Sequence, residues 1–146
     1  MDIGYRVNAR RRLKIDTFMN MTLELSKLSV CKRASVACML VTPDFRRIDS
    51  IGYNGRFPGE NHDACSGKAG ECGCVHAEIN ALLKIGNIDQ TYMMFSTTSP
   101  CLSCAAAIIA SSRVQTLFYH TLYREAEGLA LLSKYNIEHT RIPELK

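Results

Sequence analysis

Tryptophan is absent from this 146-residue sequence, and no apolar run approaches the ~20 residues that a transmembrane helix needs. The basic N-terminal cluster is not followed by an apolar core, so we expect no secretory signal and a cytoplasmic location. The net charge of +4 is small. It suits a phosphorylated small molecule but is too weak to indicate nucleic-acid binding by itself. A hydrophobic content of 47% excludes a disordered or low-complexity chain.

Cysteine, by contrast, is abundant, with seven residues in the chain. Their odd number and the lack of an export signal argue against a disulfide framework and favour metal ligation in a reducing compartment. Cys38 is the exception, because it lies in the apolar segment 36–41 and is expected to be a small buried residue.

The hydrophobic pattern predicts alternating helices and strands. We expect helices over residues 14–29, 77–85, 102–111 and 125–135, and strands over residues 36–42, 47–53, 92–96, 114–119 and 138–142. An apolar stripe on the first helix is expected at Phe18, Met21, Leu25 and Leu28. Residues 55–73 are irregular and glycine-rich, and segments of this length usually have a function or a metal that orders them. The chain is therefore predicted to be one α/β domain over residues 1–146, with residues 1–12 as a short N-terminal extension.

Two short motifs carry the chemistry, and each begins a predicted helix. The first is H-x-E, with His76 and Glu78, and the second is P-C-x-x-C, with Cys101 and Cys104. Two cysteines three residues apart in a first helical turn can direct both sulfurs the same way, and helix N-termini favour thiolates. With His76 they form a three-ligand zinc site whose fourth position is open, as in catalytic zinc sites. The open position holds water, whose pKa zinc lowers from ~15.7 towards ~7, giving hydroxide at neutral pH.

Glu78 stands two residues from His76, so we expect it beside the metal-bound water rather than on the metal. There it can take the water's proton and pass it to a ring nitrogen and then to leaving ammonia. A lone C-x-x-C is also typical of a redox pair or of half a structural zinc knuckle, and a zinc-stabilised binding protein without catalysis is the alternative from another class. The two motifs together, in this order, are the signature of zinc-dependent base deaminases.

With these motifs the chain resembles the deoxycytidylate (dCMP) deaminase family, of bacterial or phage type, within the cytidine and deoxycytidylate deaminase superfamily. The likeness spans residues 18–135. Segment 29–37, SVCKRASVA, resembles the family's S-T-C-x-R-x-x-V-G, and residues 52–55 match its G-Y-N-G. The chain departs from the family at Leu28, where an arginine is common, and at Ala37-Cys38, where the family has Gly-Ala. The resemblance implies a three-layer α/β/α, cytidine-deaminase-like fold with a mixed sheet of roughly five strands.

The same resemblance implies the substrate site. Asn54 would hydrogen-bond the sugar hydroxyl, although Asn-Gly is also a favoured tight turn. Backbone groups around Ala77 and Ser99 would hold the pyrimidine edge, and Tyr123 and Arg124 would meet the 5′-phosphate. A cation at the start of a helix is slightly unfavourable, which gives mild independent support for an anion near Arg124.

The resemblance also implies the activity: hydrolysis of dCMP to dUMP and ammonia, supplying dUMP for dTMP synthesis, in the host cytoplasm if the protein is phage-encoded. It implies a homo-oligomer, with a hexamer favoured, that dCTP activates and dTTP inhibits in the presence of magnesium. The alternative substrates are dCTP, cytidine and a base in nucleic acid. A nucleic-acid substrate is not expected, because the only dense basic run, residues 10–12, lies outside the motifs and no tryptophan is present for stacking.

A second, structural metal is the last expectation. Cys31 occupies a position that binds a second zinc in related enzymes. Cys72 and Cys74 alternate in an extended segment and can face one ion, and Cys65 lies in the glycine-rich loop. Together they would form a closed tetrahedral site that ties down the loop, with His62 able to replace one cysteine. The alternative is four unrelated thiols.

Overall fold

The computed structural model describes residues 3–68 and 71–143, without the side chains of residues 3–8 and 62. Its sheet contains β1 (Ala37–Val41), β2 (Ile48–Tyr53), β3 (Tyr92–Thr98), β4 (Val114–Thr121) and β5 (Glu138–Arg141). The helices are α1 (Ile3–Leu25), α2 (Ala77–Leu83), α3 (Leu102–Ser111) and α4 (Glu127–Lys134), with short 3-10 turns at Ser26–Leu28 and His62–Ala64. Every predicted strand is present, with ends within two residues of the prediction.

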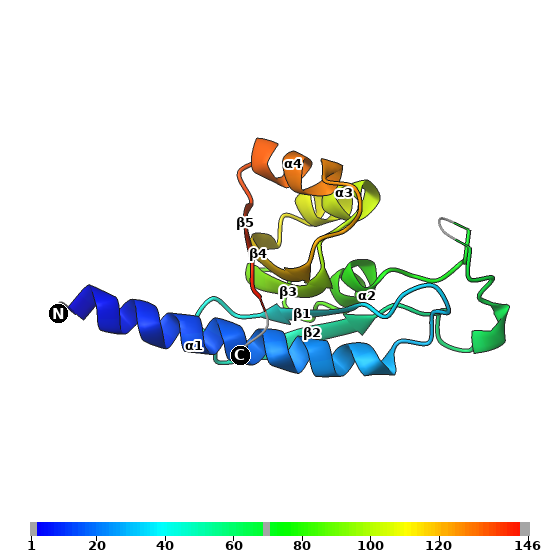
Figure 1. Cartoon of the computed structure of the whole chain (residues 1–146), viewed down its shortest axis with the longest axis horizontal. Coiled ribbons are helices and arrows are strands. Elements are labelled where there is room, and N and C mark those ends of the chain that lie inside the picture. Colours follow the sequence, from blue (N-terminus) through cyan, green and yellow to red (C-terminus); the bar gives the residue numbers. More distant parts are fainter. Residues whose placement is uncertain (1–2, 69–70, 144–146) are drawn as a thin grey trace.

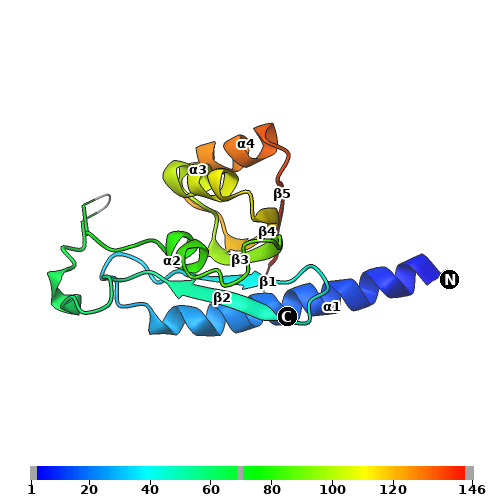
Figure 2. The same ribbon diagram turned by 180° about the vertical axis from the view of Figure 1, so that it is seen from behind.

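The strands lie in the order β2-β1-β3-β4-β5. β1 pairs antiparallel with β2 and β3, whereas β3, β4 and β5 are parallel. α1 covers one face of the sheet, and α2, α3 and α4 lie on the other (Figures 1 and 2). The mixed five-stranded sheet and the α/β/α layering are therefore confirmed. None of the described helices combines the length and apolar character needed to cross a bilayer.

Successive residues of the central strands enter different cores, as the two-residue period of a strand requires. On β1, Cys38 and Leu40 pack toward α2 and α3, whereas Met39 and Val41 pack toward α1. Because helices cover both faces, all five residues of β1 are buried, which explains why its sequence is apolar without alternation. Cys38 is fully buried, as expected.

α1 differs most from its prediction. It begins at Ile3 rather than at residue 14, so residues 3–12, expected as an extension, form its first turns. The buried row on α1 contains Ile15, Met19 and Thr22, whereas Met21, expected in the stripe, is 42% exposed. The polar Thr22 is tolerated in the core because its hydroxyl donates to the Phe18 carbonyl at 2.8 Å.

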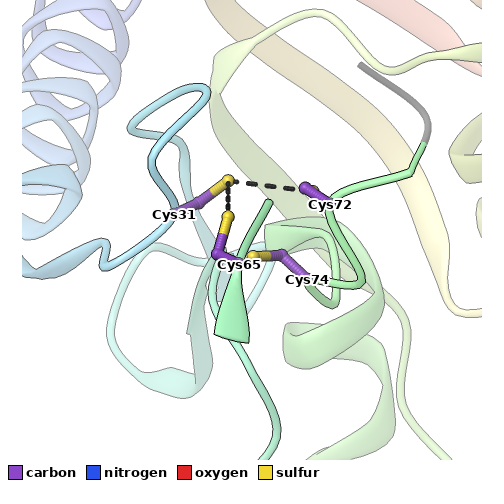
Figure 3. Close-up of side chains that lie close together, drawn as sticks. All are labelled: Cys31, Cys65, Cys72 and Cys74. Atoms are coloured by element: carbon purple, nitrogen blue, oxygen red, sulfur yellow. Dashed lines mark hydrogen bonds between the residues drawn. The ribbon is translucent and has the colours of Figure 1, made fainter. Parts of the chain in front are cut away.

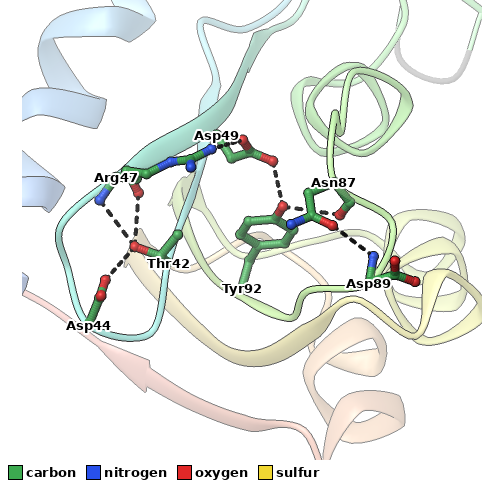
Figure 4. A network of polar contacts seen from close by, with 7 residues as sticks. All are labelled: Thr42, Asp44, Arg47, Asp49, Asn87, Asp89 and Tyr92. Carbon is green, nitrogen blue, oxygen red and sulfur yellow. Dashed lines mark hydrogen bonds and ion pairs between the residues drawn. The ribbon is translucent and has the colours of Figure 1, made fainter.

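Tyr92, the buried first residue of β3, contacts both strand β2 and the loop that precedes β3 (Figure 4). The Tyr92 hydroxyl donates to the Asp49 carboxylate and lies 3.2 Å from the Asn87 carbonyl, and Arg47 pairs with Asp49 at 3.1 Å. The bond from Tyr92 lowers the pKa of Asp49, while burial and the Asp49 charge raise that of Tyr92 to about 12. These contacts fix β2 against the entry to β3, which carries part of the candidate site on its other end.

Candidate active site

The three predicted catalytic-metal ligands stand at the starts of two helices. His76 is the N-cap of α2, Cys101 is the N-cap of α3, and Cys104 lies in the first turn of α3. Nδ1 of His76 is 3.1 Å from Sγ of Cys104 and 3.6 Å from Sγ of Cys101. Tetrahedral zinc with Zn–N of ~2.05 Å and Zn–S of ~2.3 Å would separate N and S by ~3.6 Å. The donor set and its spacing therefore fit zinc with one coordination position open.

The hydrogen bond between the two cysteines favours the thiolate of Cys101 and, together with burial, raises the pKa of Cys104. Hydrogen bonds from Cys104 and His76 lower the pKa of Cys101 to about 4, so its sulfur is a thiolate at neutral pH. The contact with Cys101 in turn raises the pKa of His76. Because metals bind thiolates, Cys101 is already in its ligand form.

Glu78 faces this group from the first turn of α2. It is only 5% exposed, and Ser96 of β3 donates a hydrogen bond to its Oε1 at 3.2 Å. Burial raises the pKa of Glu78, and a hydrogen bond from Cys104 partly offsets that effect. A buried carboxyl that is held by a strand residue and lies next to an open metal position is well placed for proton transfer.

The close packing of α2 against β2 depends on a glycine in β2. A Cβ on Gly52 would lie 2.4 Å from the Ala77 carbonyl oxygen, so no larger residue lets the strand approach the helix this closely. Just before α2, Val75 forms an isolated antiparallel bridge with Gly55, whose backbone bonds are 2.7 and 3.3 Å long. The approach of Gly52 and this bridge set the position from which His76 and Glu78 extend.

A pocket opens over these groups, and its empty space of about 370 Å³ includes open solvent at its mouth. Glu78, His76 and Cys101 are among its lining residues. Among the residues predicted to bind substrate, Asn54, Ala77, Ser99 and Tyr123 line it. The remaining lining residues are Arg33, Val36 and Thr98.

The side chains of two of these predicted residues, Asn54 and Ser99, already make hydrogen bonds within the protein. The Asn54 oxygen accepts hydrogen bonds from the Val36 backbone at 2.8 Å and from the Ser29 hydroxyl, and its amide donates to the Ala34 carbonyl at 2.6 Å. The Ser99 hydroxyl accepts from the Tyr123 backbone at 2.6 Å. Asn54 therefore shapes the pocket wall, with one amide hydrogen left for a ligand.

Arg124 lies outside the pocket. Its side chain is 63% exposed, stacks 5.7 Å from the Tyr123 ring, and lines an adjoining outer groove. Arg33 lines both the pocket and the groove, and the sequence analysis gave it no role. The signal was present, because Arg33 is the cation within segment 29–37 that matches the family pattern.

The four cysteines predicted to bind a second metal also converge (Figure 3). Sγ of Cys31 is 3.9 Å from that of Cys65 and 4.0 Å from that of Cys72, and all four sulfurs, including Cys74, lie within 4.8 Å of one another. Tetrahedral ZnS₄ with Zn–S of ~2.3 Å has sulfurs ~3.8 Å apart, whereas a disulfide needs ~2.05 Å. The alternative of four unrelated thiols is hard to reconcile with this gathering.

Backbone donors favour the thiolate of Cys65, whereas burial and the neighbouring thiols raise the pKa of Cys74. The backbone N–H of Lys32, with a smaller contribution from Gly67, lowers the pKa of Cys65 to about 6 against the effect of burial. Such N–H···S contacts stabilise the charged ligand form. The side chain of His62, the alternative ligand, lies outside the described part of the structure.

The His–Cys–Cys group and the buried glutamate, set at two helix starts beside this sheet, are the arrangement typical of the zinc-dependent base deaminases. The chain belongs to the cytidine and deoxycytidylate deaminase family, because the family's zinc-binding region matches residues 13–121. The resemblance predicted from the sequence motifs is thus confirmed.

Known relatives agree with this assignment. The chain is 31% identical over 120 residues to a deoxycytidylate deaminase of Schizosaccharomyces pombe and 27% identical over 132 residues to that of Saccharomyces cerevisiae. These alignments cover 73% and 82% of the chain but only 36% and 42% of the yeast proteins. The solved dCMP deaminase of cyanophage S-TIM5, in complex with dCMP and dUMP, is 25% identical with a TM-score of 0.74, and the match covers 97% of this chain and 99% of that one.

Proposed function

We propose that this protein is a zinc-dependent dCMP deaminase that converts dCMP and water to dUMP and ammonia. The observation that carries the proposal is the gathering of His76, Cys101 and Cys104 beside a pocket that His76, Cys101 and the buried Glu78 line. The cyanophage structure supports the choice of substrate, since that protein is described with dCMP and dUMP bound. The product dUMP would supply dTMP synthesis.

His76, Cys101 and Cys104 would hold zinc, which would supply a water molecule with a pKa lowered towards neutrality. Glu78 carries the proton steps. Its carboxylate accepts the proton that the attacking water loses and delivers it to the ring nitrogen next to the carbon under attack. After a second transfer the amino group leaves as ammonia and the carbonyl of dUMP remains. Ser96 holds the Glu78 carboxylate in place through the bond to Oε1.

The pocket walls would bind the rest of the nucleotide. The Ala77 and Ser99 backbones face the pyrimidine edge, and the remaining amide hydrogen of Asn54 meets the sugar hydroxyl. Tyr123 and Arg124, at the outer side, lie toward the 5′-phosphate.

We propose a second, structural zinc bound by Cys31, Cys65, Cys72 and Cys74. The support is the tetrahedral spacing of their sulfurs and the N–H contacts that favour the thiolate of Cys65. Such a site links residues 56–68 to the segment that follows α1, and it does not take part in the reaction. Two thiolate-rich sites require reduced cysteines, which supports a cytoplasmic location.

The substrate assignment is tested by measuring ammonia release from dCMP, dCTP, cytidine and a single-stranded oligonucleotide. We expect kcat/KM to be highest for dCMP, by at least about tenfold, because the matched cyanophage protein is described with dCMP and dUMP bound. Faster turnover of any other substrate would replace dCMP with that substrate. No ammonia from any of them, with zinc bound, would favour the non-catalytic binding protein.

For the assembly, we propose a single deaminase domain over residues 1–146 that forms a homo-oligomer, with a hexamer favoured, activated by dCTP and inhibited by dTTP with magnesium. The exposed apolar side chains Met21 and Leu28 near the end of α1, and Ile51 on β2, offer surface for a partner copy. Light scattering should give a mass well above 16.3 kDa, and dTTP should lower the rate at subsaturating dCMP. A monomer whose hyperbolic kinetics ignore dTTP would contradict both parts.

A further inference from the structure

The hydroxyl of Ser96, on strand β3, lies between two acceptors. The side chain is fully buried, with its Oγ 2.7 Å from the carbonyl oxygen of Thr98 and 3.2 Å from Oε1 of Glu78. A serine hydroxyl has one proton to donate and two lone pairs that accept, so it donates fully to only one of these oxygens at a time. The partner that receives the proton of Ser96 therefore depends on the state of Glu78.

These two partners match the two forms that Glu78 takes in the proposed reaction. As a carboxylate, Glu78 only accepts hydrogen bonds, and Ser96 can donate to it. As a carboxylic acid, Glu78 can donate its proton to the oxygen of Ser96, whose own hydrogen then turns to the Thr98 carbonyl. Rotation of one hydroxyl hydrogen thus keeps Ser96 and Glu78 hydrogen-bonded in both states without moving a heavier atom.

The other side chain that hydrogen-bonds to Glu78 makes Ser96 more important. That side chain is Cys104, whose thiol donates to the carboxyl. As a metal ligand, Cys104 would be a thiolate and would have no proton to donate. Of these two donors, only Ser96 would remain once a metal is bound. Because a buried polar group is costly to leave without a partner, the bond from Ser96 then matters for the position of Glu78.

A purely structural role is the competing explanation, because the hydroxyl could simply fasten β3 to α2. Ser50 shows what such a bond looks like. It is buried in β2, and its hydroxyl donates to the backbone carbonyl of Ala81 in α2 at 2.5 Å. A carbonyl is always an acceptor, so this bond needs no second partner. Ser96 instead connects a fixed acceptor to a carboxyl that alternates between acceptor and donor, and an anchor alone does not need that arrangement.

We propose that Ser96 is a positioning residue that holds Glu78 in both of its protonation states, by donating to the carboxylate and by accepting from the acid. The inference rests on the proposed deaminase function and adds to it a residue that acts through Glu78. Ser96 itself neither gains nor loses a proton in the reaction. The proton that Glu78 takes from the attacking water still passes to the ring nitrogen and to the leaving ammonia, while Ser96 keeps the carboxyl directed at each.

The test compares Ser96→Ala and Ser96→Thr with Ser50→Ala, all with their zinc content measured. Ser96→Ala should lower kcat for dCMP about 10- to 100-fold, as expected for loss of a hydrogen bond to a charged group. KM should stay nearly unchanged, because Ser96 is not among the described residues that line the pocket. Ser96→Thr keeps the hydroxyl and should recover most of the rate. Ser50→Ala also removes a buried bond between a strand and α2, but it should keep the wild-type kcat.

A double-mutant cycle shows whether Ser96 acts through Glu78. In protein that already contains Glu78→Gln, adding Ser96→Ala should change the residual rate less than about twofold, because the glutamine no longer alternates between two protonation states. Multiplied losses in the double variant, or equal losses in Ser96→Ala and Ser50→Ala, would make Ser96 a structural anchor and overturn the proposal. Unchanged kcat in Ser96→Ala, beside a wild type that releases ammonia, would overturn it as well. A zinc-loaded wild type that releases no ammonia would instead remove the proposed function, and this inference with it.

Discussion

Replacing Glu78 with glutamine should leave fold and zinc content intact and lower kcat by at least about 10²- to 10⁴-fold, the usual contribution of a positioned general acid–base group. Glutamine has nearly the same shape, and its carbonyl oxygen can still accept the bond from Ser96. It cannot accept the proton that the attacking water loses. The loss should therefore appear in kcat, while dCMP binding changes little.

Steady-state kinetics and zinc analysis on the purified variant make the measurement. Glu138→Gln is a matched control, because Glu138 lies exposed on the edge strand β5, outside the lining of the pocket. It should retain wild-type turnover. Turnover of Glu78→Gln within a few-fold of wild type would remove this residue from the reaction, and loss of zinc would make it a positioning residue for the metal.

The second large effect concerns metal content. Reconstituted wild-type protein should contain two zinc ions per chain, and Cys65→Ser should contain one. Cys65 is the only one of the four cluster cysteines that lies in the loop preceding Gly67, so its loss frees this loop from the cluster. Because the loop contributes few residues to either core, most of its ordering free energy comes from the metal. Limited proteolysis should therefore cut Cys65→Ser near residues 56–68 and spare the wild type.

Cys38→Ala controls for the loss of a thiol as such. Cys38 is fully buried in β1 and belongs to neither candidate metal group, so this variant should keep two zinc ions and a protected loop. A single zinc ion in carefully reconstituted wild-type protein would eliminate the second site. Two ions in Cys65→Ser would show that another ligand replaces the cysteine.

Local patterns in the sequence were sufficient to predict the strands of the sheet and to identify the two catalytic motifs. α3 was predicted without error at both ends, and α2 begins at Ala77 as expected, because each helix starts at a residue that also belongs to a motif. The strands were recognisable because continuous burial on two faces gives continuous apolar runs. The prediction that His76 and Cys101 meet at one metal rested on the two motifs, each of which begins a predicted helix.

The errors arose where tertiary contacts override local pattern. The stripe on α1 was assigned to Met21, although Met19 two residues earlier packs against the sheet, because methionines at both positions fit a helical repeat. The sequence did not predict that Arg33 lines the pocket, because only the fold brings segment 29–37 to the pocket. The occupation of the Asn54 amide by the Ser29–Val36 backbone turn was also invisible, because no spacing rule reports which polar groups are already satisfied.

The bridge between Gly55 and Val75 allows the loop between these two residues to change in length without moving its ends. The bridge joins the two ends of the segment between these residues, and Figure 1 shows residues 56–68 and 71–74 projecting away from the sheet. Closing a longer loop costs only about 0.6 kcal/mol for each doubling of its length, so added residues at the tip are thermodynamically cheap. Gly59, whose added Cβ would meet nothing within 4 Å, marks such a tip. The segment is thus a natural point for grafting a peptide or an affinity tag without shifting the register of His76.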